Sequence, residues 1–177
     1  MKKLIFICVL FCSLCVLKAF NQTEKGNYLL GGGASASINF SNGSNTFYFA
    51  LSPNMGYFII DKLTIGASLP LSLFAREGNT TINYGITPNL RYYFGPPSDI
   101  MIFVTGAFGV KGSSTKFNDS SDSSSGIRGS AGIGGTYFLN ESIGLEAILG
   151  YNFEKWAESD LNSAVVLSLG FQIYFSR

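Results

Sequence analysis

Apolar residues recur at every second position through most of the chain after residue 26. A period of two is the signature of β-strands whose two faces meet different surroundings. No window after residue 26 shows the apolar spacing of a helix of ordinary length. The pattern predicts eight strands, near residues 28–40, 46–58, 63–74, 80–94, 100–111, 127–138, 143–154 and 163–175.

The two faces of these strands differ in composition. One face is uncharged and largely apolar, as in the series Leu63, Ile65, Ala67, Leu69 and Leu71. The opposite face is mostly Gly, Ser, Thr and Asn, with few long charged side chains. A charge on a lipid-facing strand costs about 2–4 kcal/mol at the bilayer midplane, so a charge-free face is typical of strands that contact hydrocarbon.

Soluble folds with alternating strands would show other patterns. A β-sandwich would carry Lys and Glu on its outer face, and a lipocalin-like barrel would have an apolar interior and a charged exterior. We therefore predict an all-β fold, an eight-stranded antiparallel up-and-down transmembrane β-barrel over residues 27–177. Its narrow interior, here called the lumen, would be lined by the small and polar face.

Aromatic pairs close the second, fourth, sixth and eighth runs, and mark four hairpins of similar length. The turns that follow these pairs, such as "IIDK" and "NES", are shorter than most of the other connections. Outer-membrane barrels have short periplasmic turns and longer outer loops. The pairs therefore predict an aromatic girdle at the periplasmic rim, made of Tyr57, Tyr92, Phe94, Tyr137 and Phe175.

Three prolines, Pro53, Pro70 and Pro88, fall inside predicted strands. Proline has no N–H to donate to a ladder, and in a sheet it normally marks an edge or a bulge. We expect a β-bulge or a local break at each of them. The amides of Asn54 and Asn89 are expected to satisfy the freed carbonyls from the lumen side.

The first 19 residues have the order of a secretory signal peptide: a basic start, an apolar run and a small residue, Ala19. A membrane anchor is the alternative, but the 14-residue apolar run is shorter than the roughly 20 residues that span a bilayer. Residues 20–26 would form an N-terminal linker. Cleavage would remove all three cysteines, Cys8, Cys12 and Cys15, and leave no disulfide. Nine basic and eleven acidic residues would remain, which suggests no nucleic-acid partner.

At the level of whole motifs, the chain resembles the small outer-membrane β-barrel proteins of Gram-negative bacteria. It is most similar to the outer membrane protein β-barrel domain group that is abundant in Bacteroidetes. The segments that carry the resemblance are "SPNMGYFIIDKLTIG", "TPNLRYYFG", "GGTYFLNESIGLEAILGYNF" and "LSLGFQIYF".

This resemblance implies a location in the outer membrane and contact with outer-membrane lipid. It also implies recognition of the last strand by the barrel-assembly machinery, although Ser176 and Arg177 follow the terminal aromatic Phe175. Most members of the group have no assigned activity, and we expect a monomer.

The sequence contains no histidine, which removes the commonest general base and metal ligand. The known barrel enzymes resemble one another in relying on a histidine, so we expect no enzymatic activity, no metal and no cofactor. The glycine-rich stretch at residues 29–37 lacks the Lys-Ser/Thr ending of a phosphate loop, and we interpret it as a closely packed strand.

The charged residues on the lumen face are the one group of side chains in the sequence that could form a functional site. Arg91 and Glu146 lie near short turns, so we expect them to meet in the periplasmic half of the lumen. Such a pair is either a structural plug or a gate that closes a narrow pore. Nearer the outer mouth we expect Lys111, Arg128 and Glu154.

Two outer segments complete the expectations. The serine-rich stretch 112–126 is predicted to be a mobile, solvated loop, and ligand or surface contact is its alternative role. Trp156 is expected as an exposed aromatic that anchors the outer interface.

The favoured function is a structural or surface-interaction role with a largely filled lumen. The alternative is a small porin-like pore for water or small solutes, gated by the Arg–Glu pair.

Overall fold

The structure is a computed structural model that describes residues 22–41, 44–76, 79–117, 120–157 and 159–175. The expected signal peptide, residues 1–19, lies outside the described residues. Within the described ranges the chain consists of strands and turns, and no helix there is long and apolar enough to cross a membrane.

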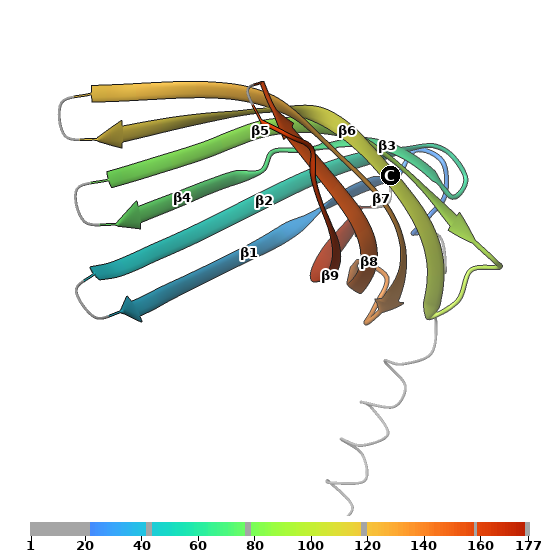
Figure 1. The fold of residues 1–177 in the computed structure, drawn as a ribbon. Coiled ribbons are helices and arrows are strands. Elements are labelled where there is room, and N and C mark those ends of the chain that lie inside the picture. Colours follow the sequence, from blue (N-terminus) through green and yellow to red (C-terminus); the bar gives the residue numbers. More distant parts are fainter. Residues whose placement is uncertain (1–21, 42–43, 77–78, 118–119, 158, 176–177) are drawn as a thin grey trace, which may run out of the picture.

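Nine strand segments form a single antiparallel sheet that closes on itself (Figure 1). β3 and β4 both pair with β2 on one side and β5 on the other, so they occupy one position in the ring. Pairing of β1 with β9 completes a ring of eight strand positions, which confirms the predicted fold class. The segments are β1 (Tyr28–Ser41), β2 (Ser44–Ile60), β3 (Leu63–Ser68), β4 (Leu71–Arg76), β5 (Asn79–Phe94), β6 (Ile100–Phe117), β7 (Ser120–Phe138), β8 (Ile143–Trp156) and β9 (Asn162–Phe175).

The large apolar side chains of the strands point outward. Phe49, Leu69, Leu149 and Leu167 are 42%, 48%, 53% and 69% exposed, and no common core gathers them. A wall of exposed apolar side chains around a closed sheet is the arrangement expected of strands that face hydrocarbon. The small buried core lies inside the ring, and its members are Leu29, Phe58, Tyr93, Met101, Phe103, Phe138 and Tyr174.

The two ends of the barrel differ. At one end, here called the short-turn end, residues 61–62, 95–99 and 139–142 connect the strands. At the opposite end, the hairpin end, the β1–β2, β4–β5 and β6–β7 hairpins project together, whereas the β8–β9 hairpin is separate from them (Figure 1). Their ladders continue to the pairs Ser41–Ser44, Arg76–Asn79 and Phe117–Ser120.

Residues 112–117 and 120–126 of the serine-rich stretch are therefore paired strand residues, so the prediction of a loop is wrong for them. Gly112 pairs with Ser125 and Ser114 with Ser123, in the same register as the rest of the β6–β7 ladder. Hydroxyl side chains occupy both faces of this extension, so its sequence has no period of two that would predict a strand. The ladder continues here because the pairing of β6 with β7 nearer the short-turn end already fixes its register.

The prolines coincide with local breaks in the sheet. The third strand position is interrupted at Leu69 and Pro70, directly opposite Ser52 and Pro53 of β2. The β5–β6 ladder is also interrupted, between Ile86 and Asn89, around Pro88. In each case the pairing resumes in the same register, so these are breaks and not β-bulges. The Asn89 amide donates to the Ser68 hydroxyl at 3.4 Å, and its expected contact with a freed carbonyl remains a prediction.

The N-terminal segment covers the short-turn end. Gln22, Thr23 and Asn27 are buried, although we expected residues 20–26 to be a linker. The Lys62 N–H donates to the Thr23 carbonyl at 2.7 Å, and the Phe58 N–H donates to the Asn27 carbonyl at 3.0 Å. Residues 22–27 are therefore tied to the rim beside the β2–β3 turn and close the mouth there.

Candidate functional site

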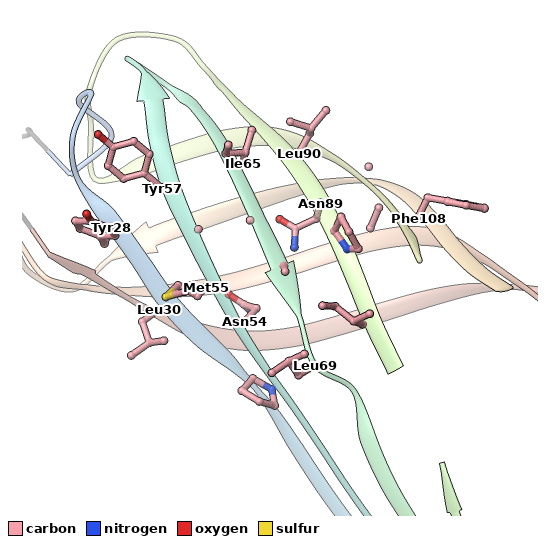
Figure 2. A pocket seen from close by; sticks show the side chains of 18 residues that line it. Tyr28, Leu30, Asn54, Met55, Tyr57, Ile65, Leu69, Asn89, Leu90 and Phe108 are labelled. Atoms are coloured by element: carbon pink, nitrogen blue, oxygen red, sulfur yellow. The ribbon is translucent and has the colours of Figure 1, made fainter. Parts of the chain in front are cut away.

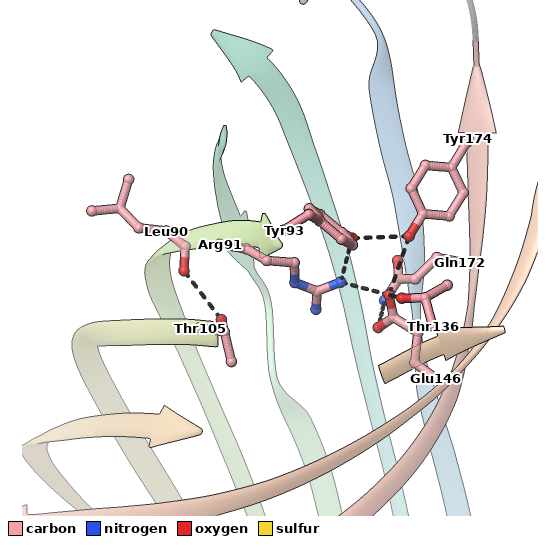
Figure 3. Close-up of polar contacts among 8 residues, drawn as sticks. All are labelled: Leu90, Arg91, Tyr93, Thr105, Thr136, Glu146, Gln172 and Tyr174. Carbon is pink, nitrogen blue, oxygen red and sulfur yellow. Dashed lines mark hydrogen bonds and ion pairs between the residues drawn. The ribbon is translucent and has the colours of Figure 1, made fainter. Parts of the chain in front are cut away.

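An ion pair crosses the lumen near the short-turn end. Arg91 projects inward from β5 and Glu146 from β8, and Arg91 Nη1 lies 2.6 Å from Glu146 Oε1 (Figure 3). Their side chains are 9% and 2% exposed. A buried charge is tolerated only when it is paired and its remaining hydrogen-bonding capacity is used. The structure thus brings together the two residues that the lumen pattern singled out.

A ring of hydrogen bonds surrounds this pair. Arg91 Nη1 donates to the Tyr93 hydroxyl at 3.1 Å, and the Tyr93 and Tyr174 hydroxyls lie 2.9 Å apart. The Tyr174 hydroxyl donates to Glu146 Oε1 at 3.3 Å. Since arginine only donates and an ionised carboxylate only accepts, Tyr93 must donate to Tyr174. The four side chains form a closed ring in which two donor paths run from Arg91 to Glu146, one direct and one through Tyr93 and Tyr174.

Two further donors complete the shell of the carboxylate. Thr136 Oγ1 donates to Glu146 Oε1, and Gln172 Nε2 donates to Glu146 Oε2, each at 3.1 Å. Glu146 therefore accepts from Arg91, Tyr174, Thr136 and Gln172. These convergent donors hold the carboxylate in one arrangement.

Aromatic rings fill the space around the network. The Arg91 guanidinium lies 4.1 Å from the centroid of the Phe103 ring, which is within cation–π range. Tyr93 contacts Phe103 with ring centroids 5.3 Å apart, and Phe138 contacts Tyr174 at 5.0 Å. Together with Phe58, these rings and the ion-pair network occupy the lumen at this level, and we call this assembly the plug.

The aromatic pairs of the sequence divide between two environments. The predicted girdle residues lie on the outer face near the short-turn end, where Tyr92, Phe94, Tyr137 and Phe175 are exposed and Tyr57 is half-buried. Their chain neighbours point inward and belong to the plug. Sequence reasoning missed the inward members Phe58, Tyr93, Phe138 and Tyr174, although the period of two assigns them to the lumen face.

A second polar cluster lies toward the hairpin end. Lys111 of β6 forms a salt bridge with Glu154 of β8, and Arg128 Nη2 lies 3.8 Å from the other oxygen of Glu154. The Lys111 ammonium also lies 3.6 Å from the centroid of the Trp156 ring. Trp156 is half-buried in this cluster and is not the exposed anchor that we expected.

A cavity of about 610 Å³ lies in the lumen above the plug. Arg91, Glu146 and Gln172 contribute to its floor. Most of its polar wall is uncharged, and the side chains there are Ser35, Ser52, Asn54, Ser68, Asn89, Thr105, Ser130, Asn152 and Ser168. Among the described residues, no group of three His, Cys, Asp or Glu side chains is placed to hold a metal ion.

A second hollow, of about 1140 Å³, lies on the outer wall (Figure 2). Outward side chains such as Leu30, Met55 and Phe108 line it, and Pro53 and Pro88 lie among small residues within it. It forms where the broken ladders leave the apolar wall thin. It faces the surroundings of the barrel and not the lumen.

Comparison with known proteins supports the architecture. The model of the outer membrane protein beta-barrel domain family matches residues 5–175. None of the curated proteins matches this chain.

Solved structures with the same fold include Neisserial surface protein A (TM-score 0.61, 20% identity, 85% of this chain and 98% of that one). The N-terminal β-barrel domain of Pseudomonas aeruginosa OprF has a TM-score of 0.56 at 14% identity, with 85% and 98% covered. Ail, the attachment invasion locus protein of Yersinia pestis, has a TM-score of 0.53 at 13% identity, with 85% and 99% covered. At these identities the likeness concerns the fold alone. Since the family model covers nearly the whole chain, this protein belongs to the outer membrane protein beta-barrel domain family and is located in the outer membrane.

Proposed function

We propose that this protein is a non-conducting outer-membrane barrel with a structural or surface-interaction role. The observation that carries the proposal is the plug, in which Arg91, Glu146, Tyr93 and Tyr174 form a closed hydrogen-bonded cycle across the lumen. Eight-stranded barrels have interiors just wide enough for side chains to fill. An ion that passes this level must displace several buried groups at once.

The free energy needed to separate Arg91 from Glu146 supports a plug that stays closed. Removing one partner of a buried ion pair typically costs about 3–5 kcal/mol, because the other charge is left uncompensated. The buried N-terminal residues Gln22 and Thr23 form a second barrier at the same end. The lumen is thus blocked at two levels near the short turns, which we assign to the periplasmic side.

The surface role rests on the projecting hairpins. The outer part of the β6–β7 hairpin exposes five serine hydroxyls between residues 120 and 125, together with the Asp122 carboxylate, and the hydroxyls can donate and accept hydrogen bonds. A paired hairpin presents these groups with less conformational entropy to lose on binding than a mobile loop would. We assign outer-membrane lipid and the barrel-assembly machinery as the partners of the apolar wall and the last strand, and a monomer as the working form.

A gated pore is the second candidate, and the cavity above the plug favours it. Among the described residues, the plug and the N-terminal segment separate this cavity from the short-turn end, so a movement of Arg91 away from Glu146 would shorten the barrier. In this function the ion pair is a gate and the solute is water or a small polar molecule.

Conductance in a planar bilayer separates the two functions. The non-conducting barrel gives no steady current, and replacing Tyr93 with alanine raises the current by removing a plug side chain. The matched control is Tyr92→Ala, which removes the neighbouring outward ring and leaves the plug intact. A steady wild-type current that changes on Arg91→Gln or Glu146→Gln substitution would establish the pore instead.

A further inference from the structure

The ring is closed along only part of one seam. β1 and β9 pair from Tyr28–Phe175 to Gly32–Phe171, and within the described residues their ladder stops there. By contrast, β1 pairs with β2 along its whole length, and β9 pairs with β8 up to Asn162. The remaining edges, residues 33–41 of β1 and 162–170 of β9, leave a gap in the wall toward the hairpin end.

Apolar or small side chains flank the gap on the outer face of the sheet. On the β9 edge the outward residues Val165, Leu167 and Leu169 are 71%, 69% and 76% exposed. On the β1 edge the outward residues are Ala34 and Ala36, which are small and also exposed. Unpaired backbone groups inside a bilayer cost several kcal/mol each unless they line a cavity that holds polar partners. These edges meet that condition, because the lumen cavity lies directly behind them.

The cavity and the gap share their walls. Gly33, Ala34 and Ser35 of β1 line the cavity, and so do Leu167, Ser168 and Leu169 of β9. The hollow is therefore continuous with the opening between the strands. Its volume of about 610 Å³ falls within the range of about 300–1,000 Å³ that is usual for small-molecule sites.

The chemistry of the cavity selects one kind of occupant. Gln172 at the floor is 3% exposed, and its Oε1 has no hydrogen-bond partner in the structure. The only charges at the floor, Arg91 and Glu146, neutralise each other. A charged group placed there would be buried without a partner, which is costly. Hydroxyl and amide groups, in contrast, match the Ser, Thr and Asn side chains of the wall.

We propose that the gap between β1 and β9 is a side entrance for an uncharged, single-chain amphiphile. Its hydroxyl or amide head group occupies the lumen cavity and forms hydrogen bonds with the hydroxyl and amide side chains of the wall. Its apolar chain passes between Ala34 and Leu169 into the bilayer. The inference rests on the proposed closed lumen, because the plug is the floor of the site.

The experiment uses a monoacylglycerol whose photoreactive diazirine lies at the head-group end of its acyl chain. The full-length protein is reconstituted in phosphatidylcholine nanodiscs, irradiated and mapped by mass spectrometry. We expect labels on the edges, near Ser35 and Ser168, and inside the lumen, near Thr105 and Ser130. Labels confined to the outer wall would overturn the proposal.

A disulfide across the gap tests the route. If the β1–β9 ladder continued in its present register, Ser35 would face Ser168 on the lumen side. The chain has no cysteine after Cys15, so the variant S35C/S168C carries one engineered pair in the barrel. Oxidation should abolish lumen labelling and reduction should restore it, while either single-cysteine variant keeps it. Where the disulfide does not form, a bulky maleimide on S168C blocks the same gap. Lumen labelling that persists in the blocked protein would overturn the side entrance.

Head-group selectivity is tested with the photoreactive fatty acid and fatty amine of the same chain length. Both should label the outer wall and not the lumen. Lumen labelling by either probe equal to that by the monoacylglycerol would overturn the proposal that the head group is uncharged.

The planar-bilayer current of the same preparations distinguishes the side entrance from the closed lumen. Absent lumen labelling without current overturns the side entrance alone, whereas a steady current overturns the closed lumen.

Discussion

Gly32 of β1 faces Pro53 of β2 at the level where the β1–β9 seam ends. Gly32 has a φ of 146°, and a Cβ built there would lie 2.4 Å from the Ser52 carbonyl oxygen and 2.9 Å from Pro53 Cα. No L-side chain fits without a backbone shift. The breaks at Pro53, Pro70 and Pro88 lie in the strands that follow β1 around the ring. We interpret this band as the level at which the closed barrel gives way to the projecting hairpins (Figure 1).

Gly32→Ala should destabilise the barrel by about 1–3 kcal/mol, because the new Cβ forces two paired strands apart. The matched control is Gly33→Ala, since a Cβ at Gly33 meets nothing within 4 Å. Urea unfolding in detergent micelles, followed by gel mobility of the folded form, measures the difference. Equal midpoints for the two variants would contradict the steric account.

Glu146→Gln should cost about 3–5 kcal/mol of folding free energy, because it leaves the Arg91 guanidinium buried without its anion. The double variant Arg91→Met/Glu146→Met should recover much of this loss, since both charges are then replaced by apolar groups. Glu24→Gln is the control: that residue is exposed on the N-terminal segment, so we expect about 0–1 kcal/mol. Unfolding curves compare the variants, and a small effect of Glu146→Gln would argue against a stabilising network.

Lys111→Met should change the fluorescence spectrum of Trp156, because the ammonium that lies 3.6 Å from the ring is lost. The sequence has one tryptophan, so the signal reports this cluster alone. The neighbouring exposed residue supplies the control, Lys155→Met, which should leave the spectrum unchanged. The cluster assignment fails if the two substitutions shift the emission equally.

The outer part of the β6–β7 hairpin should be dispensable for barrel folding. Replacing residues 115–122 with Asn-Gly joins Ser114 to Ser123, which are already ladder partners, through a two-residue turn. The apolar outward positions of these strands end at Val110 and Ile127, so no lipid-facing area is lost. We expect the unfolding free energy to change by less than about 1 kcal/mol. Loss of folded protein on a gel would show that the hairpin supports the ring.

The lipid-facing wall and the lumen could be predicted from the sequence. Alternation along a strand is local, because successive side chains point to opposite faces whatever the strand pairs with. The positions of Phe49 and Leu149 in the alternating pattern therefore assign both residues to the outer wall from the sequence alone. The same rule placed Arg91 and Glu146 inside, and their distances from short turns set their depth.

Tertiary structure alone decided which further lumen groups join the Arg91–Glu146 pair and where the ring opens. The cycle through Tyr93 and Tyr174 joins β5 to β9, and its geometry depends on how the closed sheet is staggered and not on any local pattern. The burial of Gln22, the paired serine hairpin and the unfinished seam at Gly32 depend likewise on contacts between segments that are distant in sequence. A period of two records which face a residue occupies, but it carries no information about the partner across the lumen or about where a ladder stops.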